Sequence, residues 1–289
     1  MRHVLTAVLI ASIAVTACSK KRDDAPPVAA AAVTLDRTTA AVGTPVEMSY
    51  RFTVTSGMKP LADDYTVFVH FVDRDGELLW TDDHQPPTPI RQWKPGDVIQ
   101  YTRTMFVPKV PYTGETNVDI GIYSPRTNTR LPLSGTDAGM HAYRVGTLSL
   151  ALQSDSPFVI FKSGWHETET SEGGTTEWQW TRKEGILSFR NPRRDVMMLF
   201  QADQPVKLPQ PQTVQLKIGS TVLDQFMLPT GDRVLRRVPI TAAQLGSGDS
   251  VDLTVAVDQT FVPVSMPELK TRDTRVLGIR VFRVYIQPK

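Results

Sequence analysis

Two histidines and two adjacent aspartates form the group of side chains best suited to chemistry in the first half of the chain. Asp82, Asp83 and His84 are consecutive, and His70 lies in an apolar segment shortly before them. Carboxylates and imidazoles within hydrogen-bonding distance can act as acid and base or bind a metal ion. A histidine inside a strand is more commonly a hydrogen-bonded part of the sheet, and carboxylates before Gln85-Pro86-Pro87 commonly cap turns. We favour the structural role for these residues, and a role in acid–base chemistry or metal binding stays open.

Three tryptophans form a second group, in the other half of the chain. Trp165, Trp178 and Trp180 fall close together, and four polar side chains lie near them in the sequence: His166, Glu167, Glu169 and Glu177. An exposed tryptophan ring can stack on a sugar ring while carboxylates bind its hydroxyl groups. The alternative is that Trp178 and Trp180, which alternate along one strand, pack into a core. The candidate ligand-binding residues are therefore Trp165, His166, Trp178, Trp180, His70, Asp82, Asp83 and His84.

No motif for catalysis or for a cofactor accompanies these residues. The sequence lacks the spacings His-x-His, His-Glu-x-x-His and Cys-x-x-Cys, the Gly-x-Ser-x-Gly turn, and both glycine-rich phosphate loops. Asp73-Arg74-Asp75-Gly76 lacks the later ligands of a calcium loop and suits a hairpin turn. We therefore expect no metal, no cofactor and no enzymatic activity. A hydrolase acting on envelope polysaccharide remains an alternative. Its first candidate catalytic residues are Asp82, Asp83 and His84 or the glutamates around Trp165.

The N-terminus predicts export and lipidation. Met1-Arg2-His3 is followed by an apolar run, residues 4–17, that is too short to span a bilayer comfortably. Val15-Thr16-Ala17-Cys18 resembles the bacterial lipobox, which implies cleavage before Cys18 and acylation of that cysteine, for example with palmitate. Two acyl chains on one residue anchor a protein stably in a membrane. The alternative is an ordinary signal peptide in which Cys18 has no role.

The residues after Cys18 bear on location and partners. Ser19 resembles the pattern that directs lipoproteins to the outer membrane, so we expect a lipid-anchored protein of the cell envelope that faces the periplasm. Cys18 is the only cysteine, so no disulfide is expected. With 32 Lys+Arg against 30 Asp+Glu, the net charge of +2 gives no electrostatic reason for nucleic-acid binding.

The rest of the chain has the pattern of short antiparallel strands. Val46, Met48, Tyr50, Phe52 and Val54 alternate with polar residues, as in a strand buried on one face. Further strands are expected in the first half at 65–72, 77–80, 98–107 and 118–123, and in the second half at 158–161, 185–189, 196–200, 214–226, 233–240, 251–257 and 277–286. A short helical turn is expected at 241–245. The fold class is all-β, with two antiparallel β-sandwiches.

These elements suggest four segments. Residues 1–17 form the signal peptide, 18–32 the lipidated cysteine and a flexible Pro/Ala-rich tether, 33–150 the N-terminal sandwich and 156–289 the C-terminal sandwich.

Two sets of residues carry a family resemblance. The first comprises Val69-His70-Phe71-Val72-Asp73, Gly76, Asp82, Pro86, Trp93-Lys94-Pro95-Gly96-Asp97, Pro108, Gly114, Val118-Asp119-Ile120-Gly121-Ile122-Tyr123 and Arg130-Leu131-Pro132. The second comprises Gly164-Trp165-His166, Glu177-Trp178-Gln179-Trp180-Thr181, Phe261-Val262-Pro263 and Asp273-Thr274-Arg275-Val276-Leu277-Gly278-Ile279. The two sets resemble soluble β-sandwich domains that accompany polyprenyl-phosphate-dependent membrane glycosyltransferases.

The resemblance implies an accessory role near envelope glycans. It transfers no catalytic residue, because the multi-span catalytic membrane portion is absent from this sequence. The expected function is therefore a non-catalytic lipoprotein that binds a glycan or a protein partner. A structural spacer or assembly factor without a ligand is the other alternative.

Overall fold

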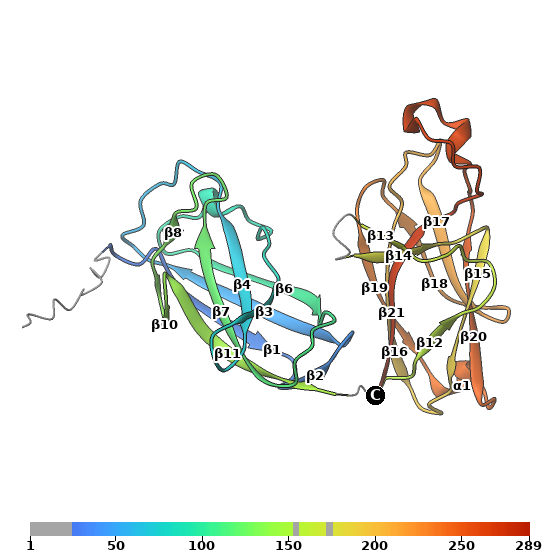
Figure 1. Ribbon diagram of the computed structural model, residues 1–289, viewed down its shortest axis with the longest axis horizontal. Coiled ribbons are helices and arrows are strands. Elements are labelled where there is room, and N and C mark those ends of the chain that lie inside the picture. The colour runs from blue at the N-terminus through green and yellow to red at the C-terminus, as the bar shows by residue number, and fades with distance from the viewer. Residues whose placement is uncertain (1–24, 153–155, 172–175) are drawn as a thin grey trace, which may run out of the picture.

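The computed structural model describes residues 25–152, 156–171 and 176–289. The described chain forms two β-sandwiches that lie side by side (Figure 1), as the strand pattern predicts. The first ends with β11 at Ala151 and the second begins with β12 at Val159. The predicted signal peptide, Cys18 and Ser19 lie outside the described residues. No described helix is long and apolar enough to cross a membrane.

The N-terminal sandwich consists of two facing sheets. One has the strand order β6-β3-β1-β9, and the other has the order β10-β11-β7-β4-β5, with β2 added to β11 and β8 added to β7. The bounds are β1 Ala29–Leu35, β2 Thr39–Ala41, β3 Pro45–Val54, β4 Thr66–Val72, β5 Leu78–Thr81, η1 Ile90–Gln92, β6 Val98–Phe106, β7 Gly114–Tyr123, β8 Arg130–Leu131, β9 Leu133–Ser134, β10 Thr136–Gly139 and β11 Ala142–Ala151.

The first strand corrects the predicted tether. β1 begins at Ala29, so residues 29–32, which the composition assigns to a flexible segment, belong to the sandwich. They pair with β3 from Ala29 opposite Val54 to Ala32 opposite Arg51. Ala29 is fully buried. Alanine side chains are small enough for this buried position beside β3. The backbone hydrogen bonds between the two strands stabilise β1, although its low hydrophobicity would not predict a strand.

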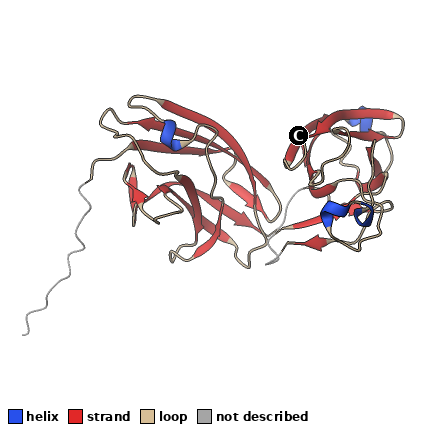
Figure 2. Ribbon diagram, turned by 90° about the horizontal axis from the view of Figure 1, so that it is seen from above, coloured by secondary structure: helices blue, strands red, loops and turns tan. Residues whose placement is uncertain are grey.

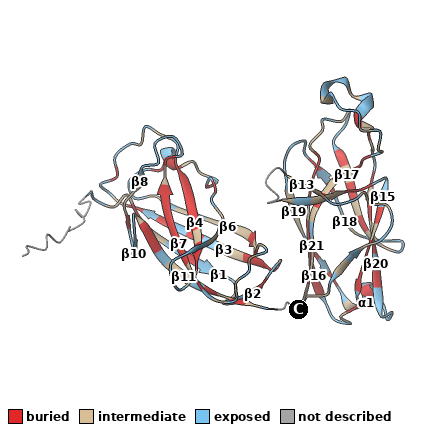
Figure 3. Cartoon of the chain, in the orientation of Figure 1, coloured by how far each residue is buried: buried red, intermediate tan, exposed pale blue. Residues whose placement is uncertain are grey.

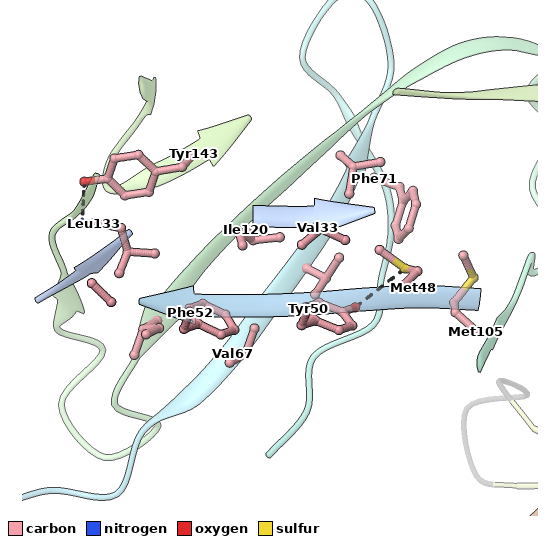
Figure 4. Packing of buried hydrophobic residues seen from close by; sticks show 14 of the residues in the cluster. Val33, Met48, Tyr50, Phe52, Val67, Phe71, Met105, Ile120, Leu133 and Tyr143 are labelled. Carbon is pink, nitrogen blue, oxygen red and sulfur yellow. Dashed lines mark hydrogen bonds between the residues drawn. The ribbon is translucent and has the colours of Figure 1, made fainter. Parts of the chain in front are cut away.

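The core of the N-terminal sandwich lies between its two sheets. Met48, Tyr50 and Phe52 alternate inward along β3, and Figure 4 shows them facing residues of β4 and β7 such as Phe71 and Ile120. All of these side chains are almost completely buried. Figure 3 shows the same concentration of buried residues along β4 and β7. The period-two pattern thus places one face of each strand in the core.

Two tight turns occur in this sandwich, and the one at residues 73–76 is the hairpin turn that the sequence predicts. Between β4 and β5, the Asp73 carboxylate accepts hydrogen bonds of 2.9 Å from the backbone N–H groups of Asp75 and Glu77. In the Trp93–Asp97 turn, Gly96 has a positive φ of 86°. Trp93 is buried and donates its indole N–H to the carbonyl of Thr88 at 3.0 Å. Both turns therefore use residue types that suit tight turns, an aspartate that binds nearby N–H groups and a glycine with positive φ.

The C-terminal sandwich has two five-stranded sheets, ordered β12-β15-β20-β17-β18 and β13-β14-β21-β16-β19. The expected segment 214–226 is a hairpin rather than one strand, because the chain turns at Gly219, whose φ is 57°. The bounds are β12 Val159–Phe161, β13 Glu169–Thr170, β14 Glu177–Trp180, β15 Glu184–Arg190, β16 Val196–Asp203, β17 Gln212–Ile218, β18 Thr221–Leu228, β19 Val234–Ile240, α1 Ala242–Leu245, β20 Ser250–Val257, η2 Pro263–Ser265, η3 Pro267–Leu269 and β21 Arg280–Pro288.

Side chains of the two sandwiches, which lie next to each other in Figure 2, contact one another. Arg237 on β19 donates to the Thr104 hydroxyl on β6 at 2.6 Å and forms an ion pair with Glu47 on β3. The guanidinium of Arg283 lies 5.1 Å from the centre of the Phe106 ring. The contact therefore involves the β3–β6 side of the first sandwich.

Candidate functional site

Asp82, Asp83 and His84 are consecutive, but their side chains alternate between the two faces of the sheet. Asp82 and His84 point between the sheets of the N-terminal sandwich, whereas Asp83 points to the outer face of β4 and β5. There, Asp83 Oδ1 accepts a hydrogen bond of 3.1 Å from the backbone N–H of Val69. His70 on β4 lies on this same outer face, directly opposite Asp119 of β7. The structure thus unites Asp83 with His70 and excludes Asp82 and His84 from their site.

His84 is a structural residue of the interior. It is 7% exposed, its Nε2 lies 2.8 Å from the hydroxyl of Tyr101, and its Nδ1 lies 2.9 Å from the carbonyl oxygen of Asp82. The ring is neutral when Nδ1–H donates to that carbonyl and Nε2 accepts from Tyr101. Burial lowers the pKa of His84 from 6.5 to about 4 and outweighs the opposing hydrogen bond to the Asp82 carbonyl. Both ring nitrogens are therefore occupied.

Asp82 belongs to the same interior cluster. Its carboxylate lies 3.5 Å from Arg103 on β6, and burial raises its pKa despite that guanidinium. The hydroxyls of Tyr50 and Tyr101 lie in the cluster too, and burial raises their pKa values strongly. These groups lie between β5 and β6, the edge strands of the two sheets, and help to pack the sheets together.

A small hollow opens on the outer face of the sheet next to His70 and Asp83. Its volume is about 330 Å³, and its lining residues are Phe68, His70, Asp83, Tyr123, Asn128 and Arg130. They come from β4, the segment after β5, the end of β7, the loop that follows it and the start of β8. This convergence of strands and loops is the candidate functional site.

An aromatic ring forms the floor of the hollow. Phe68 is only 1% exposed although it lies on the outer face of the sheet. The guanidinium of Arg130 covers it at 4.4 Å from the ring centre, and the His70 ring lies 4.7 Å from it. Arg130 is held there by a hydrogen bond of 2.9 Å to the carbonyl of Met140. Phe68 and Arg130, which form the floor and one wall of the hollow, are therefore already held in place without a ligand.

Several polar groups around the hollow have no protein partner. In the described part of the chain, the ring nitrogens of His70, the hydroxyl of Tyr123 and the side-chain amide of Asn128 form no hydrogen bond, and neither does Asp83 Oδ2. Asn128 has a left-handed backbone with φ 55°, which asparagine tolerates better than most residues. The hollow thus offers both donors and acceptors to a ligand.

The charges at the hollow are balanced. One carboxylate, Asp83, faces one guanidinium, Arg130. Burial lowers the pKa of His70 below its ordinary value, against the opposing effects of Asp83 and Asp119. The second nearby carboxylate, Asp119, is held by Arg144 through bonds of 2.9 Å and 3.1 Å to its two oxygens. At neutral pH the imidazole is therefore mostly neutral, and the lining has no net charge.

The tryptophans of the C-terminal sandwich do not form one exposed patch. Trp180 is 7% exposed and packs against Phe261 with ring centres 5.7 Å apart. Trp178 is half-buried on the same strand, and both indole N–H groups donate to one oxygen of Glu169, at 3.2 Å and 3.3 Å. Glu169 also pairs with Arg275 at 2.7 Å. For Trp180 the structure shows the packing alternative.

Trp165 and His166 are also engaged locally. The Trp165 indole donates to the carbonyl of Ile186 at 2.9 Å, and its ring packs edge-on against Phe161. A Cβ at Gly185 would come within 2.6 Å of the same ring, so glycine is required there. His166 Nε2 lies 2.9 Å from the carbonyl of Val276. No group of three or more potential metal ligands occurs among the described residues.

The comparisons with known proteins add a limited fold likeness. No family model and no curated protein matches the sequence. Similar solved structures include SGBP-B from a xyloglucan utilization locus in Bacteroides uniformis, at 8% identity and TM-score 0.32, with coverage of 91% of this chain and 74% of that chain. Another is Bacteroides ovatus SGBP-B in complex with a mixed-linkage heptasaccharide, at 11% identity, TM-score 0.24, and coverage of 86% and 51%.

A third is the M60 catalytic domain with two CBM51 domains from Clostridium perfringens ZmpB, at 7% identity, TM-score 0.28, and coverage of 85% and 34%. The chain spans about half the length of the second of these structures and about a third of the third. Similarities this low transfer neither a site nor an activity to this chain.

Proposed function

We propose that this protein is a non-catalytic glycan-binding module of the cell envelope, and that it binds one uncharged sugar unit in the hollow beside His70 and Asp83. The observation that carries the proposal is the set of unpartnered donors and acceptors around a hollow without net charge. Sugar hydroxyl groups both donate and accept hydrogen bonds, so they match such a mixed lining. A phosphorylated or acidic ligand would instead need an excess of cationic groups.

The size of the hollow limits the ligand. Its volume of about 330 Å³ lies at the lower end of the range of small-molecule sites, which begins at about 300 Å³. One sugar ring or the end of a glycan chain fits this volume, whereas an extended oligosaccharide needs a longer groove. We therefore expect recognition of a single terminal or branching sugar.

The positions and partners of the nearby carboxylates support binding without hydrolysis. Glycoside hydrolysis generally requires two carboxyl groups on either side of the scissile bond. Asp83 is free to face the ligand, but both oxygens of Asp119 are bonded to Arg144, and Asp82 points into the interior. The envelope location is part of the proposal and depends on the lipoprotein-like start at Cys18.

Glycan-array binding by the full chain tests the function. We expect binding to neutral saccharides and a loss of about tenfold or more in affinity with Asp83→Asn or Asn128→Ala, since each removes at least one hydrogen bond to the ligand. Asp75→Asn, in the exposed β4–β5 turn, is the matched control and should bind like the parent chain. Absence of binding to any neutral saccharide would overturn the proposal. So would release of sugar products that stops with Asp83→Asn, because it would show a hydrolase.

A further inference from the structure

A second hollow lies beside a turn of the C-terminal sandwich. The turn between β15 and β16 carries three arginines, Arg190, Arg193 and Arg194, which line a hollow of about 740 Å³. A neighbouring hollow of about 460 Å³ shares Arg194 and Pro288 with it and adds Arg37 from the N-terminal sandwich. The two hollows adjoin at these shared residues, and we refer to them together as the cleft.

The turn that presents these arginines is held firmly. Asn191 is 6% exposed, and its amide nitrogen lies 2.9 Å from the carbonyl oxygens of both Gly246 and Gly248. Its side-chain oxygen accepts from the backbone N–H of Arg193 at 2.8 Å. Arg193 has a left-handed backbone with φ 55°, a strained conformation for a non-glycine residue that the surrounding bonds must maintain. The arginine backbone is therefore preorganised.

The cleft has an excess of positive charge. Its charged lining residues are four arginines, Arg37, Arg190, Arg193 and Arg194, and a single carboxylate, Asp249. Arg37 pairs with Asp36, and Arg193 pairs with Asp249, whose side chain is 96% exposed and therefore binds weakly. Among the described residues, no carboxylate pairs with Arg190 or Arg194. These two guanidiniums are available to a ligand.

We propose that this cleft binds a phosphoryl group, with Arg190 and Arg194 as its principal ligands. The planar guanidinium presents N–H donors in a fork that matches two phosphate oxygens. Two unpaired guanidiniums on one rigid turn can therefore contact several oxygens of one phosphate. The phosphate can belong to a lipid headgroup or to a small soluble molecule, because both present the same oxygens to the cleft.

Isothermal titration calorimetry on the full chain at low ionic strength tests this site. The probes are inorganic phosphate, pyrophosphate and glycerophosphoglycerol, which is the phosphatidylglycerol headgroup without its acyl chains. The test variant is Arg190→Gln combined with Arg194→Gln. The matched control is Arg182→Gln combined with Arg272→Gln, which removes the same charge from exposed positions of the same sandwich. Thermal melting verifies that each variant remains folded.

We expect at least one phosphate probe to bind the parent and control chains, and the test variant to lose about tenfold or more in affinity. Tighter binding of glycerophosphoglycerol would identify a headgroup site, and tighter binding of pyrophosphate or phosphate would identify a soluble ligand. The proposal is overturned if no probe binds, or if the control variant loses as much affinity as the test variant. Neither result bears on sugar binding at the hollow beside His70.

Discussion

The ring of Phe68 occupies the space that a side chain at position 121 would need. A Cβ at Gly121 would lie 2.2 Å from Phe68 Cζ and 2.6 Å from the backbone oxygen of His141. Gly121 and Phe68 are direct partners in the β4–β7 ladder. The absence of a side chain on one strand therefore leaves room for the ring of Phe68, which lines the hollow beside His70 and Asp83.

Gly121→Ala should lower both stability and saccharide affinity. The new methyl group must displace Phe68 and the His141 backbone, and overpacking of this kind typically costs about 1–3 kcal/mol. Urea unfolding measures the loss. Gly57→Ala is the control, because no atom lies within 4 Å of the place its methyl group would occupy, and it should change stability by less than about 1 kcal/mol. Equal effects of the two substitutions would contradict the role of Gly121.

Stability should fall on acidification below about pH 6.5, largely because of His84. The unfolded histidine has a pKa near 6.5, whereas burial holds the folded value at about 4. Between these values the unfolded chain binds more protons, so the free energy of unfolding decreases as the pH falls, by about 3 kcal/mol over the whole interval. Unfolding in urea at about pH 7 and pH 4.5 measures the difference.

His84→Gln should remove most of this pH dependence. The residues around the ring, Asp82, Arg103 and Tyr101, remain in place in that variant, so the comparison isolates the imidazole. His166→Gln is the control and should retain the dependence of the parent chain. If His84→Gln also retains it, the buried imidazole is not the group responsible.

The ion pair between Asp203 and Arg280 should contribute strongly to the C-terminal sandwich. Asp203 is 4% exposed, and both of its oxygens accept hydrogen bonds of 2.8 Å from Arg280. Asp203→Asn leaves the guanidinium without its buried charge partner and should cost about 2–4 kcal/mol. Asp64→Asn, which removes the exposed partner of Arg91, should cost less than about 1 kcal/mol. Comparable losses in thermal melting would contradict this ranking.

Trp180→Phe should reduce stability without changing saccharide binding. The substitution removes buried ring atoms and the N–H bond to Glu169, and we expect a loss of about 1–3 kcal/mol. Phe158→Ala removes an aromatic side chain that is 83% exposed and should have little effect on stability. A folded Trp180→Phe variant with weakened glycan binding would instead place the sugar at the tryptophans.

The fold was largely predictable because strands such as β3 and β20 alternate buried and exposed residues. Met48, Tyr50 and Phe52 face the core with period two, and the β4–β5 turn carries its own signal in Asp73 and Gly76. The first four residues of β1 were missed because their pairing with β3 stabilises alanines that have little strand propensity of their own. Local patterns therefore identify strands with large side chains better than strands that depend on a partner.

The candidate site was only half predictable. His70 and Asp83 were among the expected residues, but their separation from His84 depends on the register between β4 and the segment after β5. Tyr123, Asn128 and Arg130 were missed as site residues, since they join the hollow only when β7 and its following loop pack beside β4. The one local signal in the sequence was the asparagine at position 128, because asparagine favours turns with a left-handed backbone such as the one found here.

The contact between the sandwiches lies on the β3–β6 side of the N-terminal unit, whereas the hollow lies on the outer surface of the β4–β7 sheet, in the other layer. A ligand in the hollow therefore meets only one of the two units. The outer face of the β4–β7 sheet can therefore change by mutation without altering the residues that hold the two sandwiches together. The binding specificity of this face can thus evolve while the arrangement of the two sandwiches stays the same, whereas the cleft that includes Arg37 depends on that arrangement.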